Sequence, residues 1–507
     1  MSQTTREEFV ALVGSGQRVL TVCREVFADA DSPVSLYRRL SESRPGSFLL
    51  ESAEQGGIWS RFSFVGVESF GTLTDVDGVS RWINYSLHES RAFDGPVPEL
   101  GLDAVSVLTQ RWASSPHGHA APLTGGLVGF IGWDAVRQLE RLPDAPPAEV
   151  PVPGQALNFV RDLVVIDHRT GTLTLVTNVL ALDGAPDYDE AIGRIDAMEA
   201  RLRAPHTAAV SLIDLTIHAQ PEHRTERDDY LSSVLTSKDY IVAGDIFQVV
   251  ISQRFELECR ATPLDVYRVL RSLNPSPYMY LLSLETVDGT PYAVVGSSPE
   301  ALVKVQEGRV FTHPIAGSRP RGGTPEVDQA LETELLADEK ERAEHLMLVD
   351  LARNDLLRVC DAGSVEVTEF MRVERFSHIM HIVSSVEGNL RDGQDAVDVF
   401  RATFPAGTLS GAPKPRALEI IDELEPAGRG VYGGVVGYFD FAGNADLAIA
   451  IRTATIASGR AYVQAGGGLV ADSDPEAEFQ ESVNKAAAPL RAVAIANALI
   501  DTASESR

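Results

Sequence analysis

The sequence predicts an α+β fold in which β-sheets pack against helices, and three observations support this class. The chain has 507 residues, of which 44% are hydrophobic and 23% charged, as in an ordinary globular protein long enough for two or three domains. Short runs rich in β-branched residues are interspersed with helical stretches. These elements do not follow the strand–helix–strand rhythm of a doubly wound parallel sheet.

The first predicted region spans residues 1–220. It mixes β-rich runs at 47–53, 163–168 and 172–182 with a helical stretch at 187–204. The segment PDAPPAEVPVPG (143–154) is predicted to be a loop, because proline blocks both helices and central strands. The composition turns polar around 204–224, which marks the predicted boundary.

The second predicted region spans residues 225–498 and interleaves with the first to form the fold. Helices are predicted at 227–244, 263–273, 326–357 and after Pro475. Strands are predicted at 245–257, 278–285, 292–298, 431–440, 446–456 and 460–468.

Charge and cysteine content exclude several classes of protein. The formal net charge of −28 argues against nucleic acid or an anionic membrane as a partner, because phosphate binding needs a basic surface. The three cysteines, Cys23, Cys259 and Cys360, form no Cys-x-x-Cys pair and fit a reducing cytoplasm. The N-terminus lacks a long apolar stretch, and no run of about 18 apolar residues predicts a membrane span.

Two Glu-x-x-Glu pairs, Glu341/Glu344 and Glu478/Glu481, lie in predicted helices far apart in the chain. Residues three apart share a helix face, so four carboxylates converge if the two faces meet. Such a concentration of negative charge is costly without a cation, and oxygen ligands suit Mg²⁺. Either pair alone is more often a solvated helix face. Glu419, Glu423 and Glu425 are predicted to form an ordinary charged face.

Ten motifs occur in the order seen in the chorismate-utilising enzymes: GDIFQVV, GSSPE, HPIAGSRPRG, DEKERAEHLMLVDLARND, FSHIMHIVS, FPAGTLSGAPK, GVVGYF, AIRT, QAGGG and AEFQESVNKA. Nearly the whole chain resembles this family, and in particular anthranilate synthase component I. The resemblance implies a chorismate-binding fold and a Mg²⁺ cofactor. It implies that Glu344 and Glu481 are direct metal ligands and that Glu341 and Glu478 support them.

The resemblance also implies how two substrate carboxylates are recognised. It places Tyr432 and Arg452 near the enolpyruvyl group. Arg452 lies in the predicted apolar strand AIAIRTATI, where a carboxylate partner would remove the cost of burying a guanidinium, although a structural ion pair is the alternative. The glycine run 466–468 (Gly466, Gly467, Gly468) is interpreted as a loop whose backbone N–H groups approach an oxyanion, although such a run alone is more often a plain turn. Lys485, four residues after Glu481, is placed to pair with it or to reach the substrate.

Proton transfer is assigned to two residues by the same resemblance. Glu300 matches the general acid at the C4 oxygen, and a buried Glu retains its proton more easily. His381 matches the histidine placed for loss of pyruvate, although a lone His on an apolar strand is more often a core residue; its neighbour His378 has no assigned role. Thr408 offers a hydroxyl that suits positioning of the ring carboxylate or the leaving group.

Two positions select the nucleophile. Isochorismate and salicylate synthases carry a water-activating Lys where this chain has Gln248, which cannot serve as that base. Aminodeoxychorismate synthases commonly carry a nucleophilic Lys where this chain has Ala316. Free ammonia is therefore the expected nucleophile. Gly317 follows, and then Ser318 stands where many relatives have Thr but keeps the hydroxyl; Ala316, Gly317 and Ser318 are predicted to line the substrate site.

The three cysteines lie outside any nucleophile elbow, so the chain lacks a glutaminase module. The family implies a separate glutamine amidotransferase subunit (anthranilate synthase component II) as the ammonia source, and hence a hetero-oligomer. Direct use of ammonium is the alternative.

Two further segments match the family's binding motif for L-tryptophan, which is expected to act as a feedback inhibitor. Glu51 suits an α-ammonium group, Ser52 a hydrogen bond, and the second segment an indole wall. The predicted tryptophan-binding residues are Leu50, Glu51, Ser52, Arg61, Asn274, Pro275, Ser276, Pro277, Tyr278, Met279, Val436 and Tyr438.

These patterns predict a Mg²⁺-dependent lyase that converts chorismate and ammonia to anthranilate and pyruvate, the first step of L-tryptophan biosynthesis. Two alternatives stay open at this point. One is an aminodeoxychorismate synthase that works without the lysine, and the other is a catalytically silent subunit that senses tryptophan.

Overall fold

The computed structural model of the chain describes residues 3–27, 31–52, 61–115, 121–182, 186–206, 210–375 and 379–501. Every strand pairing within these ranges is antiparallel. Two long strands, β3 (Phe62–Val76) and β6 (Gln155–Asp167), pair with each other and belong to two sheets at once. Their pairing shifts register repeatedly between Gly66 and Gly71, and β-bulges of this kind let strands bend from one sheet into another.

The first sheet runs from the N-terminal half of β3 and the C-terminal half of β6 in two directions. Across this sheet the strands follow the order β1 (Val19–Phe27), β7 (Thr172–Leu180), β6, β3, β2 (Ser47–Glu51), β11 (Tyr278–Glu285), β12 (Pro291–Ser298), β21 (Thr453–Ala457), β22 (Arg460–Leu469) and β10 (Gln248–Glu258). Two short strands, β9 (Glu222–His223) and β18 (Gly411–Ala412), extend along β10.

The second sheet uses the other halves of the two long strands. Across this sheet the strands follow the order β4 (Val79–Asn84), β3, β6, β5 (Gly126–Ile131), β19 (Val435–Asp440), β20 (Ala445–Ile449), β13 (Ala301–Gln306), β14 (Arg309–Thr312) and β17 (Ile379–Asn389). Strand β17 also pairs with β15 (Ile315–Pro320) and β16 (Glu366–Arg375). The short strands β8 (Ser211–Leu212) and β23 (Ile500–Asp501) form a separate pair.

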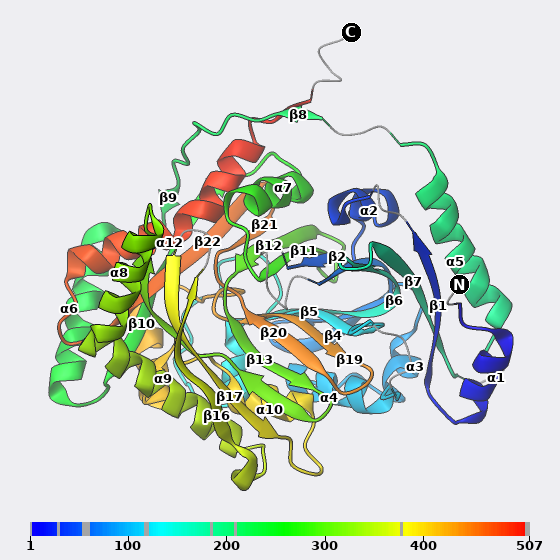
Figure 1. Cartoon of the computed structure of the whole chain (residues 1–507), viewed down its shortest axis with the longest axis horizontal. Coiled ribbons are helices and arrows are strands. Elements are labelled where there is room, and N and C mark those ends of the chain that lie inside the picture. Colours follow the sequence, from blue (N-terminus) through cyan, green and yellow to red (C-terminus); the bar gives the residue numbers. More distant parts are fainter. Residues whose placement is uncertain are drawn as a thin grey trace.

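A hydrophobic core lies between the two sheets. Phe48, Phe130, Leu282 and Val436 belong to one buried cluster, although they come from four strands of both predicted regions. Two other clusters pack the outer faces against helices. The molecule is therefore a sandwich of two sheets covered by helices on the outside (Figure 1).

The helices surround this sandwich, with α1, α2 and α5 on one side and α6, α8, α9 and α12 on the other (Figure 1). Their bounds are α1 (Arg6–Gly14), α2 (Pro33–Leu40), α3 (Glu89–Phe93), α4 (Gly101–Arg111), α5 (Tyr188–Arg203), α6 (Arg227–Ala243), α7 (Pro263–Leu273), α8 (Pro325–Ala337), α9 (Glu339–Leu357), α10 (Ala396–Thr403), α11 (Lys414–Leu424) and α12 (Pro475–Ala496), with 3₁₀ turns at Trp133–Gln138 and Ala362–Ser364.

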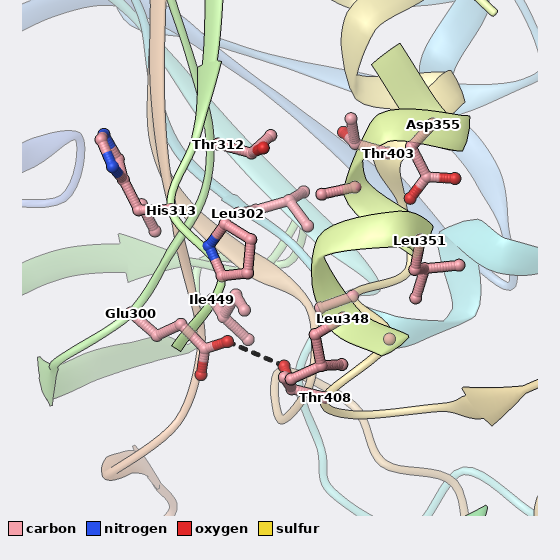
Figure 2. Close-up of a pocket in the computed structure, with 15 residues that line it drawn as sticks. Glu300, Leu302, Thr312, His313, Leu348, Leu351, Asp355, Thr403, Thr408 and Ile449 are labelled. Carbon is pink, nitrogen blue, oxygen red and sulfur yellow. Dashed lines mark hydrogen bonds between the residues drawn. The ribbon is translucent and has the colours of Figure 1, made fainter. Parts of the chain in front are cut away.

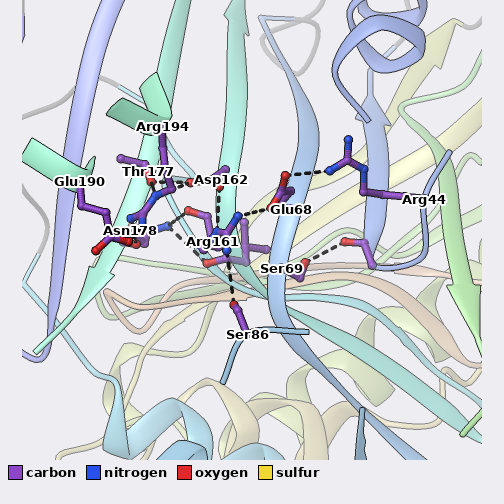
Figure 3. Close-up of polar contacts among 12 residues, drawn as sticks. Arg44, Glu68, Ser69, Ser86, Arg161, Asp162, Thr177, Asn178, Glu190 and Arg194 are labelled. Atoms are coloured by element: carbon purple, nitrogen blue, oxygen red, sulfur yellow. Dashed lines mark hydrogen bonds and ion pairs between the residues drawn. The ribbon is translucent and has the colours of Figure 1, made fainter. Parts of the chain in front are cut away.

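A network of ion pairs lies where β3 and β6 bend from one sheet into the other (Figure 3). Arg161 contacts Glu68 on β3 and donates to the neighbouring Asp162 at 2.9 Å. Asp162 is buried, accepts a hydrogen bond from Thr177 and lies 3.5 Å from Arg194 of α5. Charges that are almost fully buried need such partners, so this network holds β3, β6, β7 and α5 in one arrangement.

The structure confirms the α+β class, the interleaving of the two regions, the loop at 143–154 and most predicted elements. Two predicted elements are each split. The long helix over 326–357 is two helices, because Asp338 adopts an extended backbone and its carboxylate caps Lys340 and Glu341 of α9. The strand over 446–456 is interrupted between β20 and β21, where Arg452 has a left-handed backbone with φ of 52°.

Candidate active site

Glu300 and Thr408 meet at one wall of a cavity of about 70 Å³ (Figure 2). Glu300 lies between β12 and β13, and Thr408 lies in the turn that follows α10. The Thr408 hydroxyl donates a hydrogen bond of 2.9 Å to the Glu300 carboxyl group. Burial raises the pKa of Glu300 to about 7, although the hydrogen bond from Thr408 and the charge of Lys485 oppose the shift. A carboxylic acid in this setting keeps its proton near neutral pH.

His381 lies on β17 opposite Ser318 of β15, and its Nδ1 lies 3.0 Å from the carbonyl oxygen of Gly317. Burial lowers the pKa of His381, and the nearby charge of Arg452 adds to this effect. The β15–β17 pairing shifts register between Ala316 and Ser318, at Gly317, which has a φ of +69°. His378 lies outside the described residues.

Arg452 lies in the turn between β20 and β21, so its predicted place within a continuous strand is wrong. Burial lowers the pKa of Arg452, and the neighbouring Tyr432 and Glu481 oppose the shift. Within the described part of the chain, its guanidinium makes no hydrogen bond or ion pair. A partly buried cation without a counter-ion is suited to an anionic ligand, since a carboxylate would remove the cost of desolvation.

The glycine run 466–468 lies in strand β22, so its interpretation as a loop is wrong. It pairs with β10, where Ser252 lies opposite Gly466. Side chains approach these glycines closely. A Cβ atom on Gly468 would lie 2.3 Å from the amide nitrogen of Gln248, and one on Gly467 would lie 2.8 Å from a carboxylate oxygen of Glu478. These side chains could move aside, whereas a Cβ atom on Gly466 would lie 2.2 Å from the backbone carbonyl oxygen of Ile251, so glycine is required at Gly466.

Lys485 joins the glycine strand to the second Glu-x-x-Glu pair. Its ammonium group lies 2.7 Å from Oε1 of Glu481 and donates a hydrogen bond of 3.0 Å to the carbonyl oxygen of Gly466. The predicted pairing within α12 is thus confirmed, and the side chain also lies close enough to Glu300 to lower its pKa.

The two Glu-x-x-Glu pairs lie on α9 and α12, and the two helices bring their carboxylates within electrostatic range. Burial raises the pKa of Glu344, and Glu341 and Glu481 add to the shift. Burial also raises the pKa of Glu478, with a contribution from Glu481. Over the described residues, no group of three or more acidic, His or Cys side chains could hold a metal ion by itself.

Glu425 does not belong to an exposed charged face, so that prediction is wrong for this residue. It is buried at the end of α11 and forms an ion pair of 2.6 Å with Arg429. Its neighbours Glu419 and Glu423 contact Arg416 and Tyr240 instead. The helix ends at Leu424 and residues 425–429 are not helical, so no helical spacing in the sequence could have revealed the pair.

The predicted tryptophan segments lie side by side, because Leu50 and Glu51 of β2 pair with Tyr280 and Met279 of β11. Glu51 is buried and already accepts hydrogen bonds from the Tyr267 hydroxyl at 2.6 Å and from Arg271 at 2.9 Å. The hydroxyl oxygen of Ser52 is buried without a hydrogen-bond partner among the described residues. An ammonium group would therefore compete with Arg271 for Glu51.

The other predicted tryptophan residues divide into two groups. Tyr278 donates to Asp446 at 3.0 Å, next to Val436 and Tyr438 on the adjoining strand β19, and Ser276 faces back to its own turn with Pro275 and Pro277. Arg61, in contrast, pairs with Asp167 at 2.7 Å and covers the ring of Phe62, so it is engaged elsewhere.

Asn274 links this region to the backbone of Arg452. Its side-chain amide donates a hydrogen bond of 2.9 Å to the hydroxyl of Ser297, which is fully buried on β12. The backbone N–H of Ser297 in turn donates to the carbonyl oxygen of Arg452 at 3.2 Å. Only one residue therefore separates the predicted regulatory site from the backbone of Arg452.

The comparisons with known proteins identify the family of the chain. The family model of the chorismate binding enzymes matches residues 84–491, and the chain therefore belongs to that family. Within it, the chain is 53% identical to anthranilate synthase component 1 of Arthrobacter globiformis, over 97% of this chain and 93% of the relative. It is 46% identical to anthranilate synthase component 1 of Pseudomonas putida, over 97% and 98% of the two chains.

The fold has a solved counterpart as well. The crystal structure of anthranilate synthase component I from Streptococcus pneumoniae TIGR4 superimposes with a TM-score of 0.75 at 35% identity, covering 92% of this chain and 99% of that chain. These findings confirm the resemblance that the motifs indicated. No helix among the residues that the structure describes is long and apolar enough to cross a membrane.

Proposed function

We propose that this protein forms anthranilate and pyruvate from chorismate and ammonia, as the synthase subunit of a complex in the cytoplasm. The names of its relatives support this function. The structural observation that supports the chemistry is the hydrogen bond between Thr408 and Glu300. A buried carboxylic acid with a pKa of about 7 suits a reaction in which a hydroxyl group must leave.

Substrate binding is assigned to the cations and N–H groups that face the site. Arg452 lacks a counter-ion among the described residues and would bind a substrate carboxylate, with Tyr432 beside it. The glycine strand 466–468 is assigned to backbone contacts with the substrate, and Lys485, which donates to the carbonyl oxygen of Gly466, adds positive charge at the same strand. An acidic protein can hold a dianion only through such local cations.

The proton inventory follows from these groups. Glu300 in its acid form donates its proton to the C4 oxygen, which leaves as water while ammonia forms the new bond at C2. Loss of pyruvate then forms the aromatic ring: the C2–H bond and the C3–O bond break, and the released enol becomes pyruvate by taking a proton at its methylene carbon. His381, neutral because burial lowers its pKa, would take the ring proton at C2 and pass it to the enol. The proton that the added ammonia loses on becoming the amine returns Glu300 to its acid form. The sum is chorismate plus ammonia giving anthranilate, pyruvate and water, with no net proton consumed.

The donor set on α9 and α12 fits Mg²⁺. That ion takes one or two carboxylates and keeps water or substrate oxygens in its other positions, so it does not need a cage of three protein ligands. The negative charges of Glu341 and Glu481 raise the pKa of Glu344, and a nearby cation would relieve this repulsion. Glu344 and Glu481 would hold the ion, with Glu341 and Glu478 in support, and when bound it would supply positive charge for a substrate carboxylate.

Ammonia is the proposed nucleophile because Ala316 offers no amine and Gln248 offers no base. Both side chains are buried in the site, where Ala316 lies beside the bulge of β15 and Gln248 covers Gly468. A glutamine amidotransferase subunit is the proposed source of the ammonia, and L-tryptophan the proposed inhibitor at the β2–β11 site.

The test is product identification by mass spectrometry and fluorescence after incubation with chorismate, Mg²⁺ and ammonium sulfate at alkaline pH. We expect anthranilate and pyruvate in equal amounts, and loss of the rate on removal of Mg²⁺ with a chelator. Glu481→Gln should fold but lose metal-dependent turnover, whereas the exposed Glu476→Gln on the same helix serves as the matched control. Accumulation of aminodeoxychorismate, or tryptophan binding without any turnover, would refute the proposal.

A further inference from the structure

Arg429 and Glu425 form an ion pair in the interior, with side chains only 1% and 2% exposed. The contact is bidentate: Nε donates to one carboxylate oxygen at 2.8 Å and Nη2 to the other at 2.6 Å. The other donors of Arg429 reach the carbonyl oxygens of Leu409 and Val250, each at 2.7 Å. Glu425 also accepts from the backbone and the hydroxyl of Ser252, each at 2.8 Å.

The guanidinium of Arg429 also packs against two aromatic rings. It lies 4.2 Å from the ring centre of Trp133 and 5.6 Å from that of Tyr432. Trp133 belongs to the first region of the chain, whereas Tyr432 is a proposed substrate residue. Burial raises the pKa of Tyr432, and the charges of Arg429 and Arg452 oppose the shift, so both guanidinium groups lie near the phenol.

The pair thus bonds to the backbone beside two proposed substrate contacts, the Thr408 turn and the glycine strand. Leu409 directly follows Thr408. Ser252 lies opposite Gly466 in the β10–β22 ladder, and its hydroxyl also accepts from Gln464 at 2.8 Å. A change in the position of Arg429 would therefore move the glycine strand and the Thr408 turn together.

Hydrophobic packing would stabilise this interior at least as well as an ion pair, because desolvation of two charges is costly. A lysine would also not replace the arginine, since only the guanidinium has a planar fork and stacks on rings. We propose that Arg429, held by Glu425, is a positioning residue that fixes the ring of Tyr432 and the Thr408 turn against the substrate. The inference rests on the proposed function, since it assigns these two residues to the reacting site.

A small cavity supports this role. Arg429, Tyr432, Thr453 and Gln464 line a space of about 20 Å³ next to the pair, which is room for a single water molecule. Without the guanidinium this space would grow, and the Tyr432 ring would lose the surface that stops it from moving away from Arg452.

The test compares Arg429→Lys with Arg39→Lys. Arg39 is a control far from the site, because its side chain is only 9% exposed, pairs with Asp31 at 2.7 Å and reaches two backbone carbonyl groups. We expect both variants to lower the melting temperature. Only Arg429→Lys should reduce kcat/KM for chorismate, at least tenfold. A kcat/KM within twofold of the wild-type value in folded Arg429→Lys would overturn the proposal.

A double-mutant cycle with Tyr432→Phe separates positioning from general loss of structure. If Arg429 acts through Tyr432, the effect of Tyr432→Phe on kcat/KM should shrink severalfold in the Arg429→Lys background. Additive effects would overturn the proposal. If Arg429→Lys does not fold, the apolar double variant Glu425→Leu with Arg429→Met is measured by the same criteria, and failure of that variant to fold as well would show that the pair is only structural. Absence of anthranilate from the wild-type protein would instead refute the proposed function.

Discussion

The Thr408 hydroxyl lies 2.9 Å from the carboxyl group of Glu300, although 108 residues separate them in the chain. The contact opposes the effect of burial on the pKa of Glu300 and so keeps it near 7 rather than higher. An acid tuned in this way can both give up its proton in the reaction and regain it between turnovers.

The first prediction concerns pH. Because the pKa of Glu300 is raised from 4.5 to about 7, the acid form predominates below about pH 7 and is lost as the pH rises through that value. At a fixed concentration of free NH₃, kcat/KM for chorismate should therefore be level below about pH 7 and fall about tenfold per pH unit above it. Glu300→Gln should remove this basic limb together with most of the rate. A limb that persists in Glu300→Gln would show that another group titrates.

The second prediction concerns Thr408. Thr408→Val removes the hydrogen bond that lowers the pKa of Glu300, so the basic limb should move to higher pH. Loss of one such hydrogen bond corresponds to about 1 kcal/mol, or roughly a fivefold fall in kcat. Thr408→Ser keeps the hydroxyl and should retain both the rate and the profile. Equal behaviour of the Val and Ser variants would contradict this role.

The third prediction concerns Gly317, whose φ of +69° lies in the left-handed region. An added Cβ would also lie 3.0 Å from a carboxylate oxygen of Glu341. Gly317→Ala should destabilise the protein by about 1–2 kcal/mol, visible as a lower melting temperature, and should raise KM for chorismate. Gly323→Ala is the control, because no atom lies within 4 Å of its added Cβ. Similar melting temperatures for the two variants would argue against strain at Gly317.

The fourth prediction concerns Ser297, which connects Asn274 to the backbone of Arg452. Ser297→Ala keeps the backbone bond to Arg452 but removes the acceptor for Asn274. Inhibition by L-tryptophan should therefore weaken about tenfold, while kcat/KM without inhibitor stays within twofold. Ser283→Ala, a buried serine on β11 that bonds to Tyr37, is the control. Unchanged inhibition in Ser297→Ala would show that the coupling takes another route.

The sequence predicted the helices and strands that have a regular hydrophobic pattern, and it predicted the family through motifs. It did not predict breaks caused by single residues. Asp338 reads as one more charged residue in a helical run, yet its carboxylate caps a new helix. Arg452 reads as part of an apolar strand, and only the three-dimensional structure shows its left-handed backbone.

The sequence also did not predict contacts between residues that are far apart in the chain. Hydrophobic periodicity gives no information on which carboxylate is buried, so Glu425 looked like its neighbours Glu419 and Glu423. Glu51 was predicted to bind an α-ammonium group, whereas in the structure its carboxylate forms an ion pair with Arg271. The hydrogen bond between Thr408 and Glu300 likewise joins two motifs whose roles could be inferred only separately.

Strand β2 pairs with β11, and β5 pairs with β19, so strands from the two regions of the chain share both sheets. The two regions are therefore not expected to fold as separate fragments. A fragment that starts near residue 225 would contain every proposed catalytic side chain, yet β11 and β19 would each present an unpaired edge to solvent. Such a fragment should aggregate when produced alone and regain solubility when the N-terminal fragment is coexpressed. Chorismate chemistry in this chain is thus a property of two gene halves that must fold together.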